Sequence, residues 1–160
     1  MRITTAKEAA YDPRVVAFGR MMGAANRLEY LLGRALETEC GISHLMFEVL
    51  LIVGRSGAAG MSMRAIAQEQ VLTTGGATRL VDRMTTLGLV IRTADPDDRR
   101  VQLVRLTDAG EETTVRAARV HVENIQRFFL DPLPVDHREQ FARDLRTLSH
   151  FARDALPRLR

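Results

Sequence analysis

The sequence predicts a mainly α-helical chain with one small antiparallel β-hairpin, and two observations carry this prediction. Apolar residues recur at spacings of three and four along most of the 160 residues, and several of these stretches begin with the Ser, Thr or Asp typical of a helix N-terminus. Two short apolar runs, LGLVI at 87–91 and VQLVRL at 101–106, flank a charged segment and have the composition of paired strands.

The first predicted helix is long. Asp12 is a candidate N-cap, Pro13 suits the first helical position, and an apolar stripe continues through 13–39 until Gly41 ends it. Such a helix would be about 40 Å long. Because a small core cannot cover that length, we expect part of the stripe to meet another surface.

Three shorter helices are predicted before the hairpin. Ser43 precedes HLMFEVLLIVG, Ser62 caps the short MRAIAQEQ, and Thr73 caps TGGATRLVDRMTTLG, which Gly88 closes. Each of the three helices therefore has its own start signal, and only a brief VL separates the second from the third.

Two further helices are predicted after the hairpin. Thr107 is the expected cap of a helix that runs to Leu130, and DPLP at 131–134 then breaks the chain. The last helix is predicted to begin behind Asp136, with Glu139 three residues on as a capping box. The apolar stripes of these two helices can pack within one chain or against a second chain, and the long first helix favours a second chain.

The composition bounds the class of protein. With 46% hydrophobic and 27% charged residues, the chain is expected to be one soluble domain with a sizeable core. No apolar run approaches the roughly 20 residues that a membrane span needs, and the first residues have no apolar signal segment. Cys40 is the only cysteine, which excludes an intrachain disulfide and favours a reducing, cytoplasmic location. The net charge of +3 suits an anionic partner without demonstrating one.

The order of the central elements is that of a DNA-binding module. Two short helices joined by a tight turn and followed at once by a hairpin make a winged helix-turn-helix, whose second helix enters the DNA major groove. That helix, 73–87, has an apolar face to seal it to the domain, made of Ala77, Leu80, Val81, Met84 and Leu87. Its other flanks present polar, basic or small residues, namely Gly75, Thr78, Arg79, Asp82 and Arg83.

Residues 61–110 resemble the winged-helix core of MarR-family transcriptional regulators. TRLVDRM followed by LGLV is similar to the family's recognition helix and its exit. The most specific part is the wing and the strand after it, with Asp98, Arg99, Arg100, Leu106, Thr107 and Gly110. The flanking helices are similar in number and order.

The resemblance implies a single chain over 1–160, with a DNA-binding lobe at 43–107 and dimerisation helices at 13–40 and 108–160. It implies a homodimer that binds double-stranded, pseudo-palindromic DNA, and a repressor that a small molecule or an oxidant releases. An effector pocket is implied between the dimerisation helices and the lobe, lined by the first, second and fifth predicted helices. No cofactor is expected.

The candidate DNA-binding residues lie at the start of the recognition helix and at the wing tip. They are Thr73, Thr74, Gly75, Thr78, Arg79, Arg83, Asp98, Arg99 and Arg100. Gly75 and Gly76 weaken a helix by roughly 1 kcal/mol each. Because they have no side chain for base contact, base readout is assigned to Thr74, Thr78 and Arg79. The glycines permit close backbone approach to phosphate. By position in the family, Arg100 is expected in the minor groove, Arg99 on phosphate, and Asp98 as the residue that orients Arg100.

Two other interpretations remain open. Cys40 and the four histidines, His44, His121, His137 and His150, could serve a metal-sensing winged-helix regulator, although no pair of them has metal-site spacing. The chain could also be a winged-helix module for protein interaction without DNA, since DPDDRR by itself is most often a solvated turn. A phosphate loop, a nucleophile elbow and a paired-carboxylate motif are all missing from the sequence, so no enzyme activity is expected. Cys40 has no resolving cysteine in the chain and is interpreted as a bystander.

Overall fold

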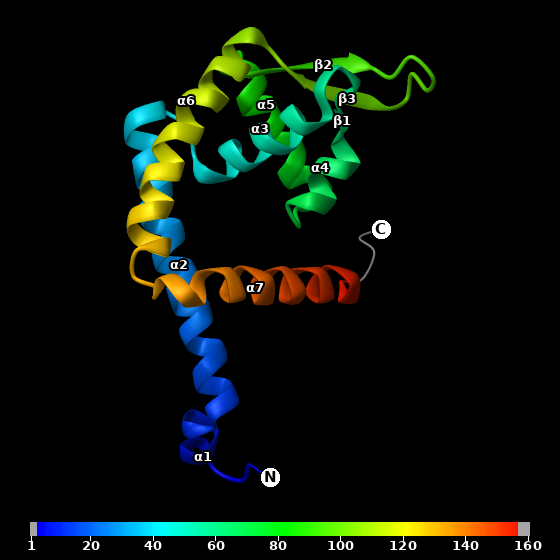
Figure 1. Cartoon of the computed structure of the whole chain (residues 1–160). Coiled ribbons are helices and arrows are strands. Elements are labelled where there is room, and N and C mark those ends of the chain that lie inside the picture. Colours follow the sequence, from blue (N-terminus) through cyan, green and yellow to red (C-terminus); the bar gives the residue numbers. More distant parts are fainter. Residues whose placement is uncertain (1–2, 157–160) are drawn as a thin grey trace.

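A computed structural model describes residues 3–156, and these are mainly helical with one small antiparallel sheet, as predicted (Figure 1). The elements in chain order are α1 (Ala6–Tyr11), α2 (Pro13–Cys40), α3 (His44–Ser56), a 3-10 turn (Gly57–Ala59), β1 (Met61–Ser62), α4 (Met63–Glu69), α5 (Thr74–Thr86), β2 (Val90–Ala94), β3 (Gln102–Leu106), α6 (Asp108–Ile125), a π-helical turn (Gln126–Leu130) and α7 (Val135–Ala155). Within the described residues, no helix has both the length and the apolar character that crossing a membrane requires.

Most helices begin where their capping residues predicted. The hydroxyl of Ser43 accepts the amide hydrogen of Met46 at 3.3 Å and starts α3. The hydroxyl of Ser62 does the same for Ala65 at 3.2 Å and starts α4. Such bonds satisfy amides that have no partner inside the helix, which is why short polar residues mark these boundaries.

The sheet has three strands in the order β1-β3-β2, all antiparallel, and the first of them was not predicted. β1 has only two residues, too few to show alternation in the sequence. Gly60 lets β1 approach β3, because its φ is 72° and a Cβ there would lie 2.9 Å from the carbonyl oxygen of Val104. The third strand therefore depends on a glycine that the sequence shows only as part of a loop.

The core is centred on the lobe formed by α3, α4, α5 and the sheet. Helix α3 contributes six buried residues: Met46, Phe47, Val49, Leu50, Ile52 and Val53. The short elements add Ile66 of α4, Val81 and Met84 of α5, Val90 of β2 and Val104 of β3, all at most 1% exposed, so they pack against α3 from several sides. Leu36 of α2 and Ala117 of α6, both 0% exposed, belong to the same cluster, so the long helices help to close this core.

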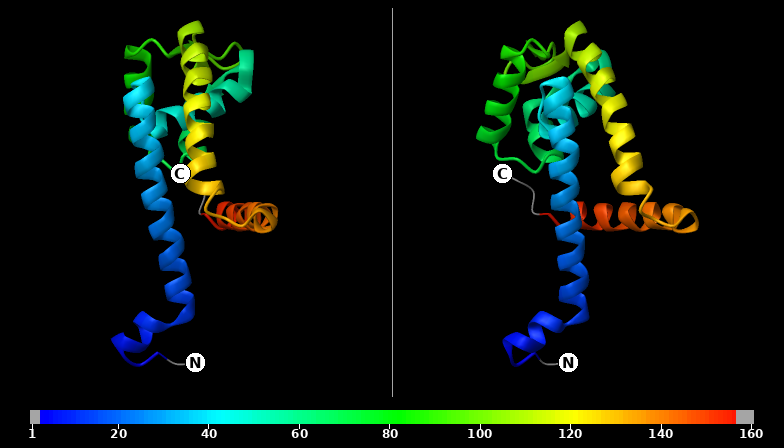
Figure 2. Two further views of the ribbon diagram at one scale, coloured as in Figure 1. Left: turned by 60° about the vertical axis from the view of Figure 1, so that its left-hand side comes forward. Right: turned by 90° about the vertical axis from the view of Figure 1, so that its left-hand side faces the viewer.

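The terminal helices are arranged differently. Helix α6 runs beside the C-terminal half of α2, whereas α7 turns away and projects beneath the lobe (Figures 1 and 2). The N-terminal half of α2 and the short α1 extend beyond both (Figure 2). Only Leu32 and Leu36 are buried in α2, and α7 has no buried residue. These helices therefore carry apolar stripes that one chain leaves uncovered.

An extra helix, α1, precedes the first predicted one. Its signal is present in the sequence: Thr5 and Glu8 form a capping box, in which the Thr5 hydroxyl accepts the Glu8 amide hydrogen at 3.1 Å. Asp12 ends α1 and starts α2, as predicted for its N-cap role. The hydrogen bond that its carboxylate accepts from the Arg14 side chain, together with one from the Arg14 amide, lowers the pKa of Asp12 to about 2.

The boundaries of the last two helices were predicted incorrectly. Regular α-helix ends at Ile125, and the predicted continuation to Leu130 is a π-helical turn. Helix α7 begins at Val135, so Asp136 lies inside its first turn and the capping box predicted with Glu139 does not form. Pro134 precedes the helix instead, and the Arg138 guanidinium donates to the Leu133 carbonyl at 3.1 Å. Proline can precede a helix that has no side-chain cap. The pattern of Asp136 and Glu139 therefore predicted the wrong start for α7.

Candidate nucleic-acid interface

Helix α5 divides into a buried and an exposed face largely as predicted. Ala77, Val81 and Met84 are at most 1% exposed, and Leu80 packs against the same core. Leu87 was expected on this face but is 49% exposed, because the helix has ended at Thr86 and Leu87 is the C-cap. The buried stripe is therefore one turn shorter than the sequence indicated.

The start of α5 is built around Thr73 and the two glycines. The Thr73 hydroxyl accepts the amide hydrogen of Gly76 at 3.1 Å and caps the helix. A Cβ at Gly75 would meet nothing within 4 Å, whereas one at Gly76 would lie 3.2 Å from the Thr73 hydroxyl oxygen. The backbone at Gly75 is thus open to an approaching group, as a phosphate contact at a helix N-terminus requires.

The side chains assigned to base readout lie on the flank of α5 away from the core. Arg79 and Arg83 are exposed and Thr78 is half-buried. The Thr78 hydroxyl donates to the Thr74 carbonyl at 2.9 Å, which leaves its oxygen free to accept a hydrogen bond. Threonine in this place therefore presents an acceptor and a methyl group, while Arg79 presents donors.

The tip of the wing is a closed, hydrogen-bonded turn. The Asp95 amide donates to the Val101 carbonyl at 2.9 Å, and the Val101 amide donates to the Asp98 carbonyl at 2.8 Å. The Asp95 carboxylate also accepts the Asp97 amide hydrogen at 2.9 Å. These bonds order seven residues without any contribution from the core, which explains how a tip of this length keeps one shape.

Arg100 is held in place by Asp98, as the sequence predicted. The Asp98 carboxylate accepts the Arg100 amide hydrogen and the Arg100 Nε–H at 3.0 Å each, and the Arg100 Nη2 donates to it at 3.2 Å. These bonds lower the pKa of Asp98, the side-chain bond most strongly. The Arg100 side chain is nevertheless 92% exposed, and Arg99 beside it is exposed as well. The tip presents a preoriented guanidinium to solvent.

One residue that contacts the predicted recognition helix, Arg92, was not identified from the sequence. Its guanidinium reaches from β2 to α5, where Nη2 lies 2.7 Å from the Asp82 carboxylate and donates to the Thr78 carbonyl at 3.2 Å. Asp82, which the sequence placed on the flank that faces DNA, is therefore occupied by the wing. A signal existed, because Arg92 follows the buried Val90 by two residues and so points to the same side of the strand.

The Leu-Thr-x-x-Gly segment joins the wing to α6. Thr107 caps α6 through its bond from the Gly110 amide at 2.9 Å, and its hydroxyl donates to the Gly88 carbonyl at 2.6 Å. A Cβ at Gly110 would lie 1.9 Å from the carbonyl oxygen of Leu89, a distance that no side chain can adopt. The spacing of threonine and glycine is thus required for the end of α5, the base of the wing and the start of α6 to meet.

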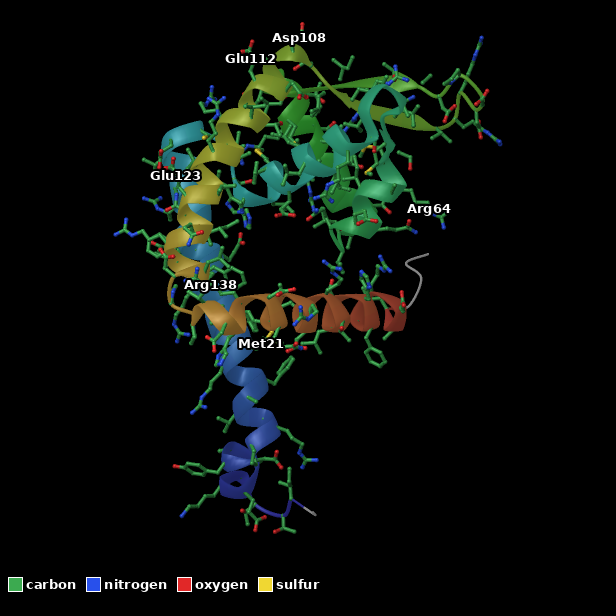
Figure 3. All side chains as sticks on the ribbon, viewed as in Figure 1. Met21, Arg64, Asp108, Glu112, Glu123 and Arg138 are labelled. Carbon is green, nitrogen blue, oxygen red and sulfur yellow. The ribbon has the colours of Figure 1, made fainter. Side chains whose placement is uncertain are left out.

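The two groups of predicted residues form separate patches. The loop between β2 and β3, which carries residues 98–100, extends beyond the rest of the lobe and away from α5 (Figure 1). The acidic side chains of Asp108 and Glu112 project from the first turns of α6, at the opposite end of the lobe from the tip (Figure 3).

A pocket lies where a long helix meets the lobe. It has a volume of about 410 Å³ between α2 and the start of α3 and is lined by Asn26, Glu29, Tyr30, Gly33, Arg34, Glu37, Ser43, His44 and Leu45. No residue of α6 lines it, so the effector pocket expected between the first, second and fifth predicted helices stays a prediction. In residues 3–156, no group of three or more His, Cys, Asp or Glu side chains could hold a metal ion, and Cys40 is a half-buried free thiol packed against the core.

A helix-turn-helix followed by a wing defines the class of winged-helix proteins. Comparison with known proteins narrows this class. The MarR family pattern matches residues 32–101. The HTH-type transcriptional regulator YkoM of Bacillus subtilis (strain 168) is 29% identical over 91 residues, which are 57% of this chain and 58% of YkoM. The matched region thus spans little more than half the length of that relative.

Two solved structures are similar over most of the chain. Sco3205, a MarR family transcriptional regulator from Streptomyces coelicolor crystallised with DNA, has 25% identity and a TM-score of 0.79 over 94% of each chain. CouR from Rhodococcus jostii RHA1, bound to p-coumaroyl-CoA, has 26% identity and a TM-score of 0.70 over 86% of this chain and 92% of CouR. Residues 32–101 thus match the MarR family, and the fold over most of the chain is similar to that of MarR family transcriptional regulators.

Proposed function

We propose that this protein is a cytoplasmic repressor that binds double-stranded, pseudo-palindromic operators as a homodimer and is released by a small molecule. Residues 43–107 form its DNA-binding lobe, and 13–40 and 108–160 supply the dimer contacts. Arg79, Thr74 and Thr78 read bases in the major groove, Thr73 and Gly75 present the capped start of α5 to a phosphate, and Arg83 neutralises another. Each wing inserts Arg100 in the minor groove beside Arg99 on phosphate.

The observation that carries this proposal is the state of Arg100. A guanidinium whose side chain is 92% exposed and which yet donates two hydrogen bonds to one carboxylate has already lost much of its freedom. Ordering a flexible arginine costs entropy on binding, so preorganisation favours a role in recognition over that of a solvated turn. The related Sco3205 was crystallised with DNA, which agrees with this reading.

The uncovered helices support the homodimer. Helix α7 exposes Leu148 and Phe151 to 56% and 77%, and α2 exposes Phe18 to 62%. Apolar stripes of this length on two helices are typical of an interface, and a second copy of the chain offers the same stripes in return. A dimer in turn places two lobes at a fixed separation, which suits an inverted repeat with half-sites about one helical turn apart.

The pocket between α2 and α3 supports release by a small molecule. It lies where the long helices join the lobe, so an occupant would bear on both parts. CouR, of similar fold, binds p-coumaroyl-CoA. A ligand that fits only one relative position of helices and lobe shifts the population toward it and so changes DNA affinity.

Selection of bound duplexes from a random DNA pool tests the function directly. We expect an inverted repeat to be enriched, and compounds that dissociate this complex can then be screened. On the selected duplex, Arg79→Ala should weaken binding by roughly 1–3 kcal/mol, and by less on random DNA, because it loses a base contact. Arg116→Ala, an exposed arginine of α6, serves as the control and should leave specific binding unchanged.

The alternatives predict other results. Equal loss on specific and random DNA would make Arg79 a phosphate contact and overturn the readout assignment. Absence of duplex binding even at low salt would favour a protein-interaction module. A stoichiometric, tightly held metal in the purified protein, required for DNA binding, would favour the metal-sensing regulator.

A further inference from the structure

Two histidine rings meet where α2, α3 and α6 come together. His44 stands at the first position of α3 and His121 near the C-terminal end of α6, with ring centroids 5.0 Å apart and planes at 40°. The ring of Phe47, one turn further along α3, lies 4.9 Å from His121 in an edge-on arrangement. This histidine pair therefore sits where α3 of the lobe meets the long helices α2 and α6. Figure 2 shows how these helices lie relative to the lobe.

Carboxylates from two helices surround His44. Its Nδ1 contacts the Glu29 carboxylate of α2, and its Nε2 lies 3.5 Å from the Glu48 carboxylate of α3. Arg34 and Glu37 line the same cavity but pair with each other at 3.7 Å. The contact at Nδ1 links α3 to α2, whereas Nε2 forms no hydrogen bond among the described residues and has only the Glu48 carboxylate nearby.

His121 has no comparable support. Its Nδ1 is buried and has no hydrogen-bond partner among the described residues. Burial lowers the pKa of His121, the charge of His44 lowers it further, and the more distant Glu48 and Glu29 oppose the shift. A proton on His121 would therefore be desolvated and would be repelled by positive charge on His44.

We propose that the His44–His121 pair is a proton-sensitive joint between the lobe and the dimerisation helices. With His121 neutral, its ring packs against His44 and Phe47 and holds α6 against the start of α3. Once His121 is protonated, repulsion and the demand for solvation separate α6 from α3, and the lobe loses its fixed orientation. The expected loss of DNA affinity rests on the proposed function, whereas the separation of α6 from α3 does not.

The direction of the pH effect follows from the pKa of His121. Because this pKa is lower in the folded chain than the ordinary value of 6.5, the unfolded chain binds the proton more readily. The contribution of neutral His121 to the stability of the folded chain is fully present above pH 6.5. It is lost as the pH falls through the lower pKa that His121 has in the folded chain. The joint is thus closed at neutral pH and opens in mild acid.

Thermal unfolding between pH 7.5 and 5 tests the joint without DNA, with His121→Phe as the variant that keeps a ring in place and cannot titrate. His121→Gln is a second non-titrating variant, and His137→Gln, an exposed histidine of α7, is the control. The unfolding midpoint of the wild type should fall by roughly 3 °C more than that of either His121 variant, and the control should follow the wild type. Parallel pH profiles for all four proteins would overturn the proposal.

Duplex affinity at constant ionic strength then tests the regulatory consequence. Between pH 7.5 and 5.5 we expect a loss of about ten-fold for the wild type and the control, beyond any loss shown by His121→Phe. A difference in unfolding without a difference in affinity would overturn the regulatory role. Absence of duplex binding at pH 7.5 in every protein would count against the proposed function alone, because the unfolding profiles still decide the joint.

Discussion

The lobe and the terminal helices use similar apolar patterns with opposite results. In the lobe, the six buried residues of α3 are each less than 8% exposed, and the short elements around it close one core. In α7, the same spacing of three and four leaves every residue of the helix unburied. The spacing of three and four therefore predicts only that a helix has an apolar face. The length and direction of neighbouring elements decide whether one chain can cover that face. The contrast is between a core that one chain closes, with Leu36 of α2 and Ala117 of α6 contributing to it, and an apolar stripe on α7 that the described residues leave uncovered.

The largest effect is expected where the lobe is tightest. Gly110→Ala places a Cβ 1.9 Å from the Leu89 carbonyl, so the junction of wing and α6 must open, at a cost of about 3 kcal/mol or more in the free energy of unfolding. Urea denaturation at fixed protein concentration measures this change. Gly75→Ala is the matched control in the first turn of α5, where the added methyl meets nothing within 4 Å. It should stabilise the protein by about 0.5–1 kcal/mol, and a similar loss in both variants would contradict the clash.

The next effect concerns the uncovered helices. Leu148→Glu puts a charge into the apolar stripe of α7, and the dissociation constant of the dimer should rise at least about 100-fold because that charge is desolvated at the interface. Sedimentation of the wild type should give twice the mass of one chain, and the variant should give a single chain. Thr147→Glu adds the same charge off the stripe and should leave the dimer intact. A wild type that remains monomeric at micromolar concentration would refute the division between lobe and terminal helices.

A smaller effect is expected at the wing tip, which lies in the lobe but contributes nothing to its core. Arg100→Ala should weaken binding of the selected duplex by roughly ten-fold, without change in unfolding or in oligomeric mass. Arg99→Ala should act evenly across DNA sequences and reduce the salt slope by about one unit. Fluorescence anisotropy over a series of salt concentrations separates the two.

Asp98→Ala distinguishes orientation from simple charge. Removal of a negative charge should favour an anionic partner, yet we expect weaker binding because Arg100 loses the carboxylate that holds it. Since the pKa of Asp98 is lowered by Arg100, the pair persists across about pH 5–8, so mild acid should not imitate this substitution. Tighter binding by Asp98→Ala, with no effect of Arg100→Ala, would make the tip a solvated turn.

The smallest effect tests a strained position within the lobe. Val71, in the turn between α4 and α5, has a φ of 51°, which a β-branched residue adopts only at a cost, and its side chain is 60% exposed. Val71→Gly should therefore stabilise the protein by about 1 kcal/mol in the same urea experiment. Val71→Asn, which tolerates this backbone conformation, should give part of the gain. No gain from either variant would mean that the packing of Val71 compensates for the strain.

Much of the candidate site was predictable because its causes are local. Helix starts at Ser43, Ser62, Thr73 and Thr107 depend on a hydroxyl and an amide three residues apart, and such pairs can be read from the sequence. The bond between Asp98 and Arg100 spans two residues and was predicted for the same reason. Where two local signals compete, as at Pro134 and Asp136, the sequence indicated the wrong start of α7.

The tertiary structure alone decided the contacts between distant segments. Arg92 reaches Asp82 and Thr78 across 10 and 14 residues, because β2 folds back along α5. His44 and His121 are 77 residues apart in the sequence, yet their rings meet between α3 and α6. Strand β1 exists only because Gly60 lets it reach β3. By itself, the sequence determined the helices, their caps, the hairpin and the ordered wing tip, all set by residues within one or two turns of each other. Which faces are covered and which charges meet depends on how those elements pack, since distance along the chain does not determine distance in the fold.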